Sequence, residues 1–306
     1  MRNLRIGMVG LGDISQKAYL PILSKEIDWD FIGAFSPNKE KCKRICKQYR
    51  IQDFNNITLL ARECDAIFVH SSTDSHFEVV STLLNMGKDV YVDKPLAATI
   101  SDAEKLVELS EKTGRKIMVG FNRRFAPMYM KAKQEAKKAS LIRIEKHRID
   151  SVGPYSYEFT MIDDYLHLVD TIRWLGNDDL YVLNGTINVN TENHLLYANH
   201  IFKTSDGTSF CTTMHRKAGT NVELLNFLTE GALVQVKNLN TLEIERAGIL
   251  STEYTPSWDS ILKQKGFEDA VYHFIRCIQN DIQPCINGIE GLKSQLLVHQ
   301  LLQNKE

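Results

Sequence analysis

Residues 5–15 read Arg5-Ile6-Gly7-Met8-Val9-Gly10-Leu11-Gly12-Asp13-Ile14-Ser15. This apolar run breaks into closely spaced glycines, which predicts a strand, a tight turn and a helix from Ile14 to about Leu23. Such a turn directs unpaired helix amides at one point, where they can bind a phosphate or pyrophosphate. An ordinary strand-to-helix turn is the alternative, because Ser15 replaces the third glycine of the dinucleotide-binding fingerprint.

Strand and helix patterns alternate through about residue 120. After the glycine turn, the predicted strands are the short apolar runs 30–35, 65–70, 89–92 and 116–120. Their nearly continuous apolar character indicates a sheet with helices on both faces, which is typical of a doubly wound parallel sheet. We therefore expect an α/β protein with an N-terminal Rossmann domain.

Beyond residue 121 the pattern changes. Segments near 180–190, 196–204, 208–215, 221–228 and 232–246 alternate between polar and apolar residues. This alternation predicts a C-terminal α+β domain built on a large, mostly antiparallel sheet with one open face. We expect a dinucleotide-binding domain at 1–121 and a substrate-binding and oligomerisation domain at 122–306. The open face predicts a homodimer or homotetramer that assembles through the C-terminal sheet.

The composition argues against proteins that bind nucleic acids or membranes and against proteins that span a membrane. The 306 residues include 37 basic and 38 acidic ones, and the net charge of −1 argues against nucleic-acid partners and anionic membrane surfaces. No apolar run approaches the roughly 18–20 residues of a membrane helix, so we expect a cytoplasmic protein. Six scattered cysteines without a Cys-x-x-Cys pair predict free thiols and no metal site.

In an open parallel sheet the ligand lies beyond the carboxyl ends of the strands. Small, polar or charged residues follow each predicted strand, and this coincidence favours dinucleotide binding. We expect cofactor contacts from Gly10, Gly12, Asp13, Ile14, Ser36, Asn38, Lys39, Ser71, Ser72, His76, Lys94 and Arg124.

The end of the second strand bears on the choice of cofactor. An acidic residue there usually binds the ribose of NAD, whereas this chain has Ser36. Serine leaves room for a 2′-phosphate that Asn38 or Lys39 could meet, which favours NADP over NAD. For Lys39 the alternative is a solvated helix face.

Candidate catalytic residues come from both predicted domains. Lys94 stands at a strand end and precedes Pro95, which restrains the backbone; the alternative is a solvated lysine. In the helical pattern of 161–175, Asp163 and His167 lie one turn apart, so the carboxylate can orient a histidine base. The alternatives are a capping aspartate with a buried histidine, or a metal site that adds Asp170.

Several of these motifs together resemble a known family. They are Gly10–Ile14, the loop 71–76, Asp93-Lys94-Pro95-Leu96, the stretch 120–125 and Asp163-x-x-x-His167. In order and spacing they resemble the glucose-fructose oxidoreductase and inositol dehydrogenase (Gfo/Idh/MocA) family over almost the whole chain. Within that family the chain most resembles the MviM-like virulence-factor homologues. It departs from the pattern at Asp93, where glutamate is usual, and at Ser72, where proline is usual.

The resemblance implies an NAD(P)-dependent oxidoreductase. Hydride would pass between nicotinamide C4 and a secondary alcohol or ketone of a sugar, cyclitol or related polyol, with Lys94, His167 and Asp163 as catalytic residues. We expect substrate contacts from Lys94, Asn122, Tyr155, Asp163, Asp164 and His167. The alternatives are a non-catalytic NAD(P)-binding regulator and an enzyme of glycosidase or dehydratase type that uses NAD transiently.

Overall fold

The computed structural model describes residues 2–25, 27–177 and 180–303. Two compact units divide the chain: Met1–Phe121 with Phe267–Lys293, and Asn122–Gly266 with Ser294–Glu306. The segment Phe267–Lys293 lies in the first unit, although the sequence suggested one continuous second domain. It lies there because Phe267 and Phe274 pack on aromatic side chains of that unit.

The first unit contains a parallel sheet, as predicted, but the sheet has six strands, because the two-residue strand β3 at Gln52–Asp53 adds to the five that were predicted. Its strand order is β3-β2-β1-β4-β5-β6, so the direction of winding reverses between β1 and β4. Its strands are β1 (Leu4–Val9), β2 (Trp29–Phe35), β3 (Gln52–Asp53), β4 (Ala66–Val69), β5 (Asp89–Val92) and β6 (Ile117–Val119).

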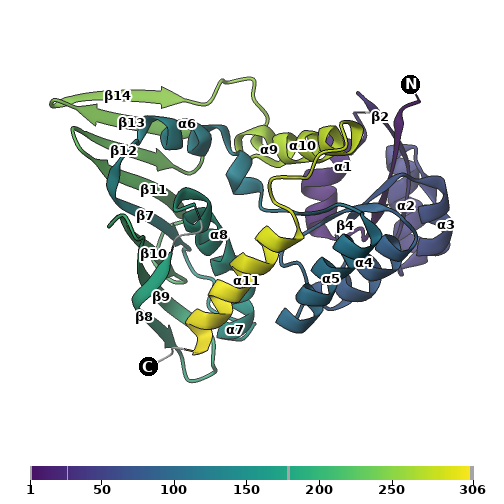
Figure 1. Ribbon diagram of the computed structural model, residues 1–306, viewed down its shortest axis with the longest axis horizontal. Coiled ribbons are helices and arrows are strands. Elements are labelled where there is room, and N and C mark those ends of the chain that lie inside the picture. The colour runs from purple at the N-terminus through teal and green to yellow at the C-terminus, as the bar shows by residue number, and fades with distance from the viewer. Residues whose placement is uncertain (1, 26, 178–179, 304–306) are drawn as a thin grey trace. The chain divides into compact units, whose positions relative to one another are not determined.

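Helices cover both faces of this sheet (Figure 1). On one face Phe68 and Tyr91 pack against Phe274. On the other face a Cβ added to Gly7 would lie 2.9 Å from Leu60, which shows how closely the helix 57–63 packs there. The helices of this unit are α1 (Leu20–Leu23), α2 (Lys39–Tyr49), α3 (Ile57–Glu63), α4 (His76–Asn85), α5 (Ile100–Thr113) and α10 (Phe267–Gln279).

The second unit is built on an eight-stranded sheet of order β14-β13-β12-β11-β7-β10-β9-β8. Among the described strands of this second sheet only the β7–β10 pair is parallel, so the predicted, mostly antiparallel sheet is confirmed. Its strands are β7 (Ala139–His147), β8 (Tyr181–Val189), β9 (Leu195–Lys203), β10 (Ser209–His215), β11 (Val222–Thr229), β12 (Ala232–Lys237), β13 (Thr241–Arg246) and β14 (Ile249–Tyr254).

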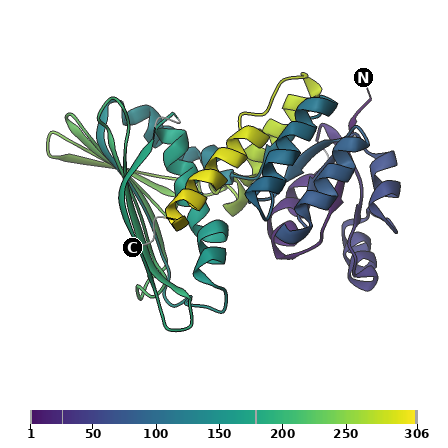
Figure 2. The same ribbon diagram turned by 60° about the horizontal axis from the view of Figure 1, so that its bottom comes forward.

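Helices lie against one face of this sheet and leave the other open (Figure 2). On the open face Leu228 and Leu233 pair across β11 and β12 and remain 49% and 42% exposed. The helices are α6 (Pro127–Glu135), α7 (Tyr157–Thr160), α8 (Leu166–Leu175), α9 (Ile261–Gln264) and the later part of α11 (Gly288–Gln303). Within the described ranges, no helix has the length and apolarity needed to cross a bilayer.

Candidate active site

The two glycines of the turn after β1, Gly10 and Gly12, are surrounded differently in the fold. Gly10 has φ +92°, and a Cβ there would lie 2.4 Å from the backbone of His70 and Ser71, so the fold itself requires glycine. A Cβ on Gly12 would come no nearer than 4.0 Å to the carbonyl of His70, so the fold leaves space beside it. That open space beside a helix start fits the close approach of a pyrophosphate.

Ser15 closes the turn from within. Its side chain is fully buried, and the hydroxyl donates to the carbonyl of Gly12 at 2.8 Å. A π-helical turn, Ser15–Tyr19, follows and continues into α1, so the predicted helix after the glycines is present. Asp13 is exposed and pairs with Lys17 at 2.8 Å, which lowers the pKa of its carboxyl.

The end of β2 carries no carboxylate. Ser36 is 9% exposed, and Lys39 extends into solvent from the first turn of α2. The Asn38 side chain accepts a hydrogen bond from the amide of Lys41 at 2.9 Å, so it caps α2. Capping occupies its oxygen, which leaves Ser36 and Lys39 as the more available of the predicted ribose contacts.

The loops after β4 and β5 are tied together. The Ser75 hydroxyl lies 2.8 Å from both the Ser71 hydroxyl and the Ser72 carbonyl, and its one hydrogen is shared between these two acceptors. Buried His76 lies with Nδ1 2.9 Å from the carbonyl of Pro95 and Nε2 3.2 Å from that of Ser71.

The stretch that carries Lys94 lies at the same edge of the sheet. The amide of Lys94 donates to Oδ1 of Asp93 at 2.9 Å, so the aspartate that replaces the usual glutamate bonds the lysine's own backbone. The structure thus brings the Gly10 turn, Ser71, His76 and Lys94 to the carboxyl edge of one sheet.

Sequence reasoning missed His70, the residue directly after β4. Its ring stacks on Tyr19 with 3.8 Å between centroids, and the side chain is 4% exposed. Burial lowers the pKa of His70 to about 3, which keeps the ring neutral. The carbonyl of the same residue limits space at Gly10. Its place at a strand end is the signal that could have drawn attention to it.

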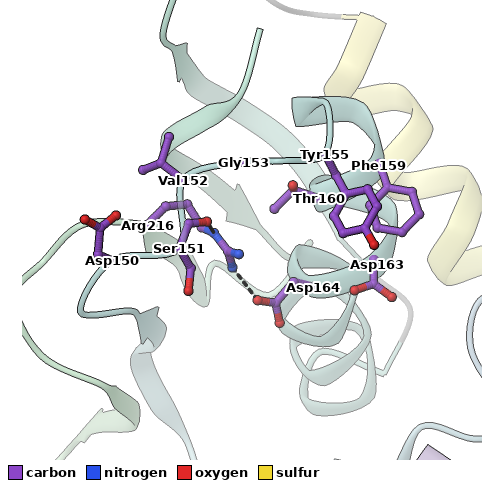
Figure 3. Close-up of a pocket in the computed structure, with 10 residues that line it drawn as sticks. All are labelled: Asp150, Ser151, Val152, Gly153, Tyr155, Phe159, Thr160, Asp163, Asp164 and Arg216. Carbon is purple, nitrogen blue, oxygen red and sulfur yellow. Dashed lines mark hydrogen bonds and ion pairs between the residues drawn. The ribbon is translucent and has the colours of Figure 1, made fainter. Parts of the chain in front are cut away.

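In the second unit a cavity of about 450 Å³ lies beside the helices that precede α8 (Figure 3). Tyr155 and Phe159 stack at one side with 4.5 Å between ring centroids and an interplanar angle of 27°. Asp163 lies below these rings in the figure. The lining residues are Asp150, Ser151, Val152, Gly153, Tyr155, Phe159, Thr160, Asp163, Asp164 and Arg216. Predicted substrate contacts Tyr155, Asp163 and Asp164 are therefore brought together.

Asp164 is engaged by three cations. Lys146 binds Oδ1, while Arg216 at 2.5 Å and Arg148 at 3.4 Å reach Oδ2. These charges hold the pKa of Asp164 well below its usual range. Burial, with the nearby charge of Arg123, lowers the pKa of Lys146 to about 8. The predicted substrate contact thus has its oxygens committed to the protein.

A second buried ion pair adjoins this cluster, and sequence reasoning missed it. Arg123 donates to both carboxylate oxygens of Glu223 at 2.7 and 2.8 Å, and the Tyr129 hydroxyl donates to Glu223 at 3.0 Å. The positive charges of Arg123 and Lys146 outweigh the effect of burial and lower the pKa of Glu223 to about 2. No local pattern in the sequence pairs residues so far apart.

Asn122 and Arg124 both lie buried in the second unit. The Asn122 amide donates to the carbonyl of Lys265 at 2.7 Å. Arg124 forms a two-fold hydrogen-bonded pair with Asp170, at 2.9 and 2.7 Å, and its role toward the cofactor stays a prediction. The pair occupies Asp170, the third ligand of the metal alternative. Within the described ranges no group of three His, Cys, Asp or Glu residues is placed to hold a metal ion.

Asp163 and His167 lie on consecutive helical segments. Asp163 belongs to a π-helical turn, Met161–Tyr165, and lines the cavity. His167 stands in the first turn of α8, is partly buried, and its carbonyl accepts a hydrogen bond from Thr171 at 2.7 Å. The predicted helix is present, with a π-turn at Asp163 and Asp164, two of the predicted substrate contacts, while His167 lies in the α-helix that follows. Such turns occur frequently at functional sites.

Comparison with known proteins agrees with this architecture. Residues 4–121 match the oxidoreductase family with an NAD-binding Rossmann fold, and residues 127–247 match the YceM-like C-terminal domain. YceM of Salmonella typhimurium is 44% identical over 98% of each chain. The solved structure of the dehydrogenase MviM from Clostridium difficile is 47% identical over 99% of each chain, with a TM-score of 0.97.

A more distant relative has a named activity. Inositol 2-dehydrogenase of Paracoccus denitrificans is 33% identical over 187 residues, which are 58% of this chain and 55% of that one. The resemblance inferred from the motifs is therefore confirmed, and the chain belongs to the Gfo/Idh/MocA family of NAD-binding oxidoreductases, with a second unit of the YceM-like kind.

Proposed function

We propose that the protein interconverts a secondary alcohol and a ketone of a sugar, cyclitol or related polyol, with NAD(P) as the redox partner. The cavity of the second unit carries this proposal. It combines the stacked, half-exposed rings of Tyr155 and Phe159 with the carboxylate of Asp163 and the hydroxyls of Ser151 and Thr160.

These groups suit a polyhydroxylated ligand. Aromatic rings offer flat apolar surface to the C–H face of a sugar or cyclitol, and a carboxylate accepts strong hydrogen bonds from hydroxyl groups. The rest of the lining is mostly polar, with Asp150, Asp164 and Arg216 among its residues, which suits a ligand rich in hydroxyl groups better than an apolar one. The named activity of the Paracoccus denitrificans relative supports the same class of substrate.

We assign the chemical roles residue by residue. The Gly10 turn and the loop at Ser71 hold the cofactor, whose nicotinamide supplies or accepts hydride at C4 when bound. His167 takes the hydroxyl proton during oxidation and returns it during reduction. The ammonium of Lys94 stabilises negative charge that develops on the substrate oxygen, and Asp163 holds the substrate or orients His167.

The residues after β2 support a preference for NADP. Ser36 offers no carboxylate to the ribose, and Lys39 is exposed in the first turn of α2, which follows the same strand. We propose that NADPH binds at least as tightly as NADH. Side-by-side titration of the two by fluorescence tests this, and a strong preference for NADH contradicts it.

We propose further that the protein is a homodimer or homotetramer assembled through the open face of the second sheet. Exposed apolar residues such as Leu228 and Leu233 lie in pairs on that face. The same face carries the hydrogen-bonded polar pair Asn226 and Gln235 beside these leucines, so the exposed leucine pair, rather than a continuous apolar surface, is what supports an interface here.

The decisive experiment is a panel of polyols and sugar acids, scored by NAD(P)H absorbance. Lys94→Met and His167→Asn should lower kcat by about a hundredfold or more and leave cofactor binding largely unchanged. Lys112→Met and His299→Asn replace exposed residues of the same types and serve as matched controls. Near-normal turnover in either active-site variant contradicts the assigned role. A protein that binds cofactor tightly yet acts on no member of the panel favours the regulator instead.

A further inference from the structure

His76 opens α4 between two backbone carbonyls of the first unit. Its side chain is 1% exposed, with Nδ1 2.9 Å from the carbonyl oxygen of Pro95 and Nε2 3.2 Å from that of Ser71. The sequence pattern grouped His76 with the cofactor contacts. Both ring nitrogens, however, face acceptors of the protein, which leaves no nitrogen for a ligand from outside.

The hydrogen-bond inventory of imidazole defines what this arrangement does. A neutral ring carries one N–H and donates to one of the two carbonyls, whereas a protonated ring donates to both. The protonated ring therefore joins the segments that follow β4 and β5 by two hydrogen bonds, whereas the neutral ring donates one hydrogen bond and only packs against the other carbonyl. Burial lowers the pKa of His76, while the two carbonyls and the nearby Asp93 carboxylate act in the opposite direction and the charge of Lys94 lowers the pKa further.

The carbonyls of Ser71 and Pro95, which the ring contacts, lie in two segments to which we assign a function. Ser71 stands in the loop assigned to the cofactor, and Pro95 directly follows Lys94. On the other side of Lys94, the Asp93 carboxylate accepts the lysine's amide hydrogen at 2.9 Å. The backbone is therefore held on both sides of the lysine, by Asp93 before it and by His76 after it.

We propose that His76 is a positioning residue: by bridging Ser71 and Pro95, it fixes the backbone that presents the Lys94 ammonium, and it does not itself contact the cofactor. The inference rests on the function proposed for Lys94. It predicts that loss of the bridge acts on turnover through Lys94 and leaves cofactor affinity nearly unchanged.

Two substitutions separate the bridge from simple packing. Phenylalanine keeps a planar ring without any hydrogen-bond donor, so His76→Phe should lower kcat about tenfold or more and change the Kd for NADH less than twofold. The amide nitrogen of glutamine carries two hydrogens that can reach two carbonyls, so His76→Gln should recover kcat to within about threefold of the parent protein. Ser81→Ala, on the same helix, is the control for general disturbance of α4.

The outcomes are distinguishable. Equal kcat losses for the two variants, or a rise in the NADH Kd that matches the loss of kcat, overturn the proposal. A double-mutant cycle with Lys94→Met tests the route: His76→Phe should lower kcat no further in that background, and additive losses contradict an action through Lys94. If Lys94→Met alone keeps normal turnover, the function proposed for Lys94 fails instead.

Discussion

Arg124 and Asp170 form a buried ion pair with two parallel hydrogen bonds, from Nε to Oδ2 at 2.9 Å and from a terminal nitrogen to Oδ1 at 2.7 Å. Ser294 adds a third hydrogen bond to the carboxylate at 2.7 Å. Because Asp170 lies on α8, one turn after His167, the pair joins the turn at 122–125 to the helix of the proposed base. The arginine that the sequence assigned to cofactor contact thus anchors that helix.

Removal of this carboxylate should destabilise the protein strongly. Asp170→Asn leaves the Arg124 guanidinium buried without its counter-charge, and we expect the free energy of unfolding to fall by about 3–5 kcal/mol. Asp28→Asn, at an exposed position, should change it by less than about 0.5 kcal/mol. Urea denaturation at neutral pH measures both. Equal, small changes in the two variants would contradict the anchoring role of the pair.

The two glycines of the first turn should respond differently to alanine. Gly10→Ala places a methyl group 2.4 Å from backbone atoms at a φ of +92°, so we expect loss of both stability and cofactor binding. In Gly12→Ala the methyl group meets only the carbonyl oxygen of His70, at 4.0 Å, so the melting temperature should stay near that of the parent protein while NADH affinity drops. Calorimetry and fluorescence titration separate the two. Unchanged NADH affinity in Gly12→Ala would place the pyrophosphate elsewhere.

The first sheet could be predicted from the sequence because each of the predicted strands is marked by residues within and directly after it. Each strand is a short apolar run followed by a polar strand end, and the parallel arrangement follows from helices between the strands. Position at a strand end also singled out Lys94 and Ser71. The sequence did not predict that Phe267–Lys293 belongs to the first unit. An amphipathic pattern predicts a helix with one apolar face, but it does not tell which of two hydrophobic cores that face will cover.

In the second unit, too, contacts between residues far apart in the sequence could not be predicted. Asp164 was predicted as a substrate contact, which stays a prediction, but nothing in the sequence indicated that three cations from Lys146, Arg148 and Arg216 would bind its carboxylate. The stretch 232–246 read as one strand, and the structure turns it at Asn238 and Leu239, both in the left-handed region. That turn lacks the glycine or proline that usually marks one.

Stability should fall in acid because of Glu223. Its pKa is lowered from 4.5 to about 2 in the folded protein, so the unfolded chain binds the proton first as the pH drops. The stabilisation is present above about pH 4.5 and is lost as the pH falls through 2, for a total on the order of 3 kcal/mol. Urea denaturation at pH 5 and pH 3 measures part of this loss, because pH 3 is still above the pKa of Glu223 in the folded protein. In Glu223→Gln the loss between these pH values should be smaller, and an unchanged loss would assign it to other carboxyls.

Lys146 should likewise make folding stability rise with pH, in the alkaline range. Its pKa is lowered from 10.5 to about 8, so between these values the unfolded chain holds a proton that the folded protein has released. Folding stability from this group therefore rises as the pH increases from 8 toward 10.5. Lys146→Met removes the titrating group and keeps Arg148 and Arg216 on Asp164. The variant should show a flatter stability curve over this range, and an identical slope would exclude Lys146 as its source.

The open face of the second sheet yields the last test. Leu228 and Leu233 are directly paired across β11 and β12 and half exposed, so a charge at this position would be buried without a partner in any assembly through the face. Leu228→Glu should shift the protein to monomer at micromolar concentration in light scattering, with its melting temperature nearly unchanged. Ile261→Glu, at an exposed position outside the sheet, should leave the assembly intact. A parent protein that is itself monomeric removes the proposed interface, because the apolar pairs would then face water in the native state.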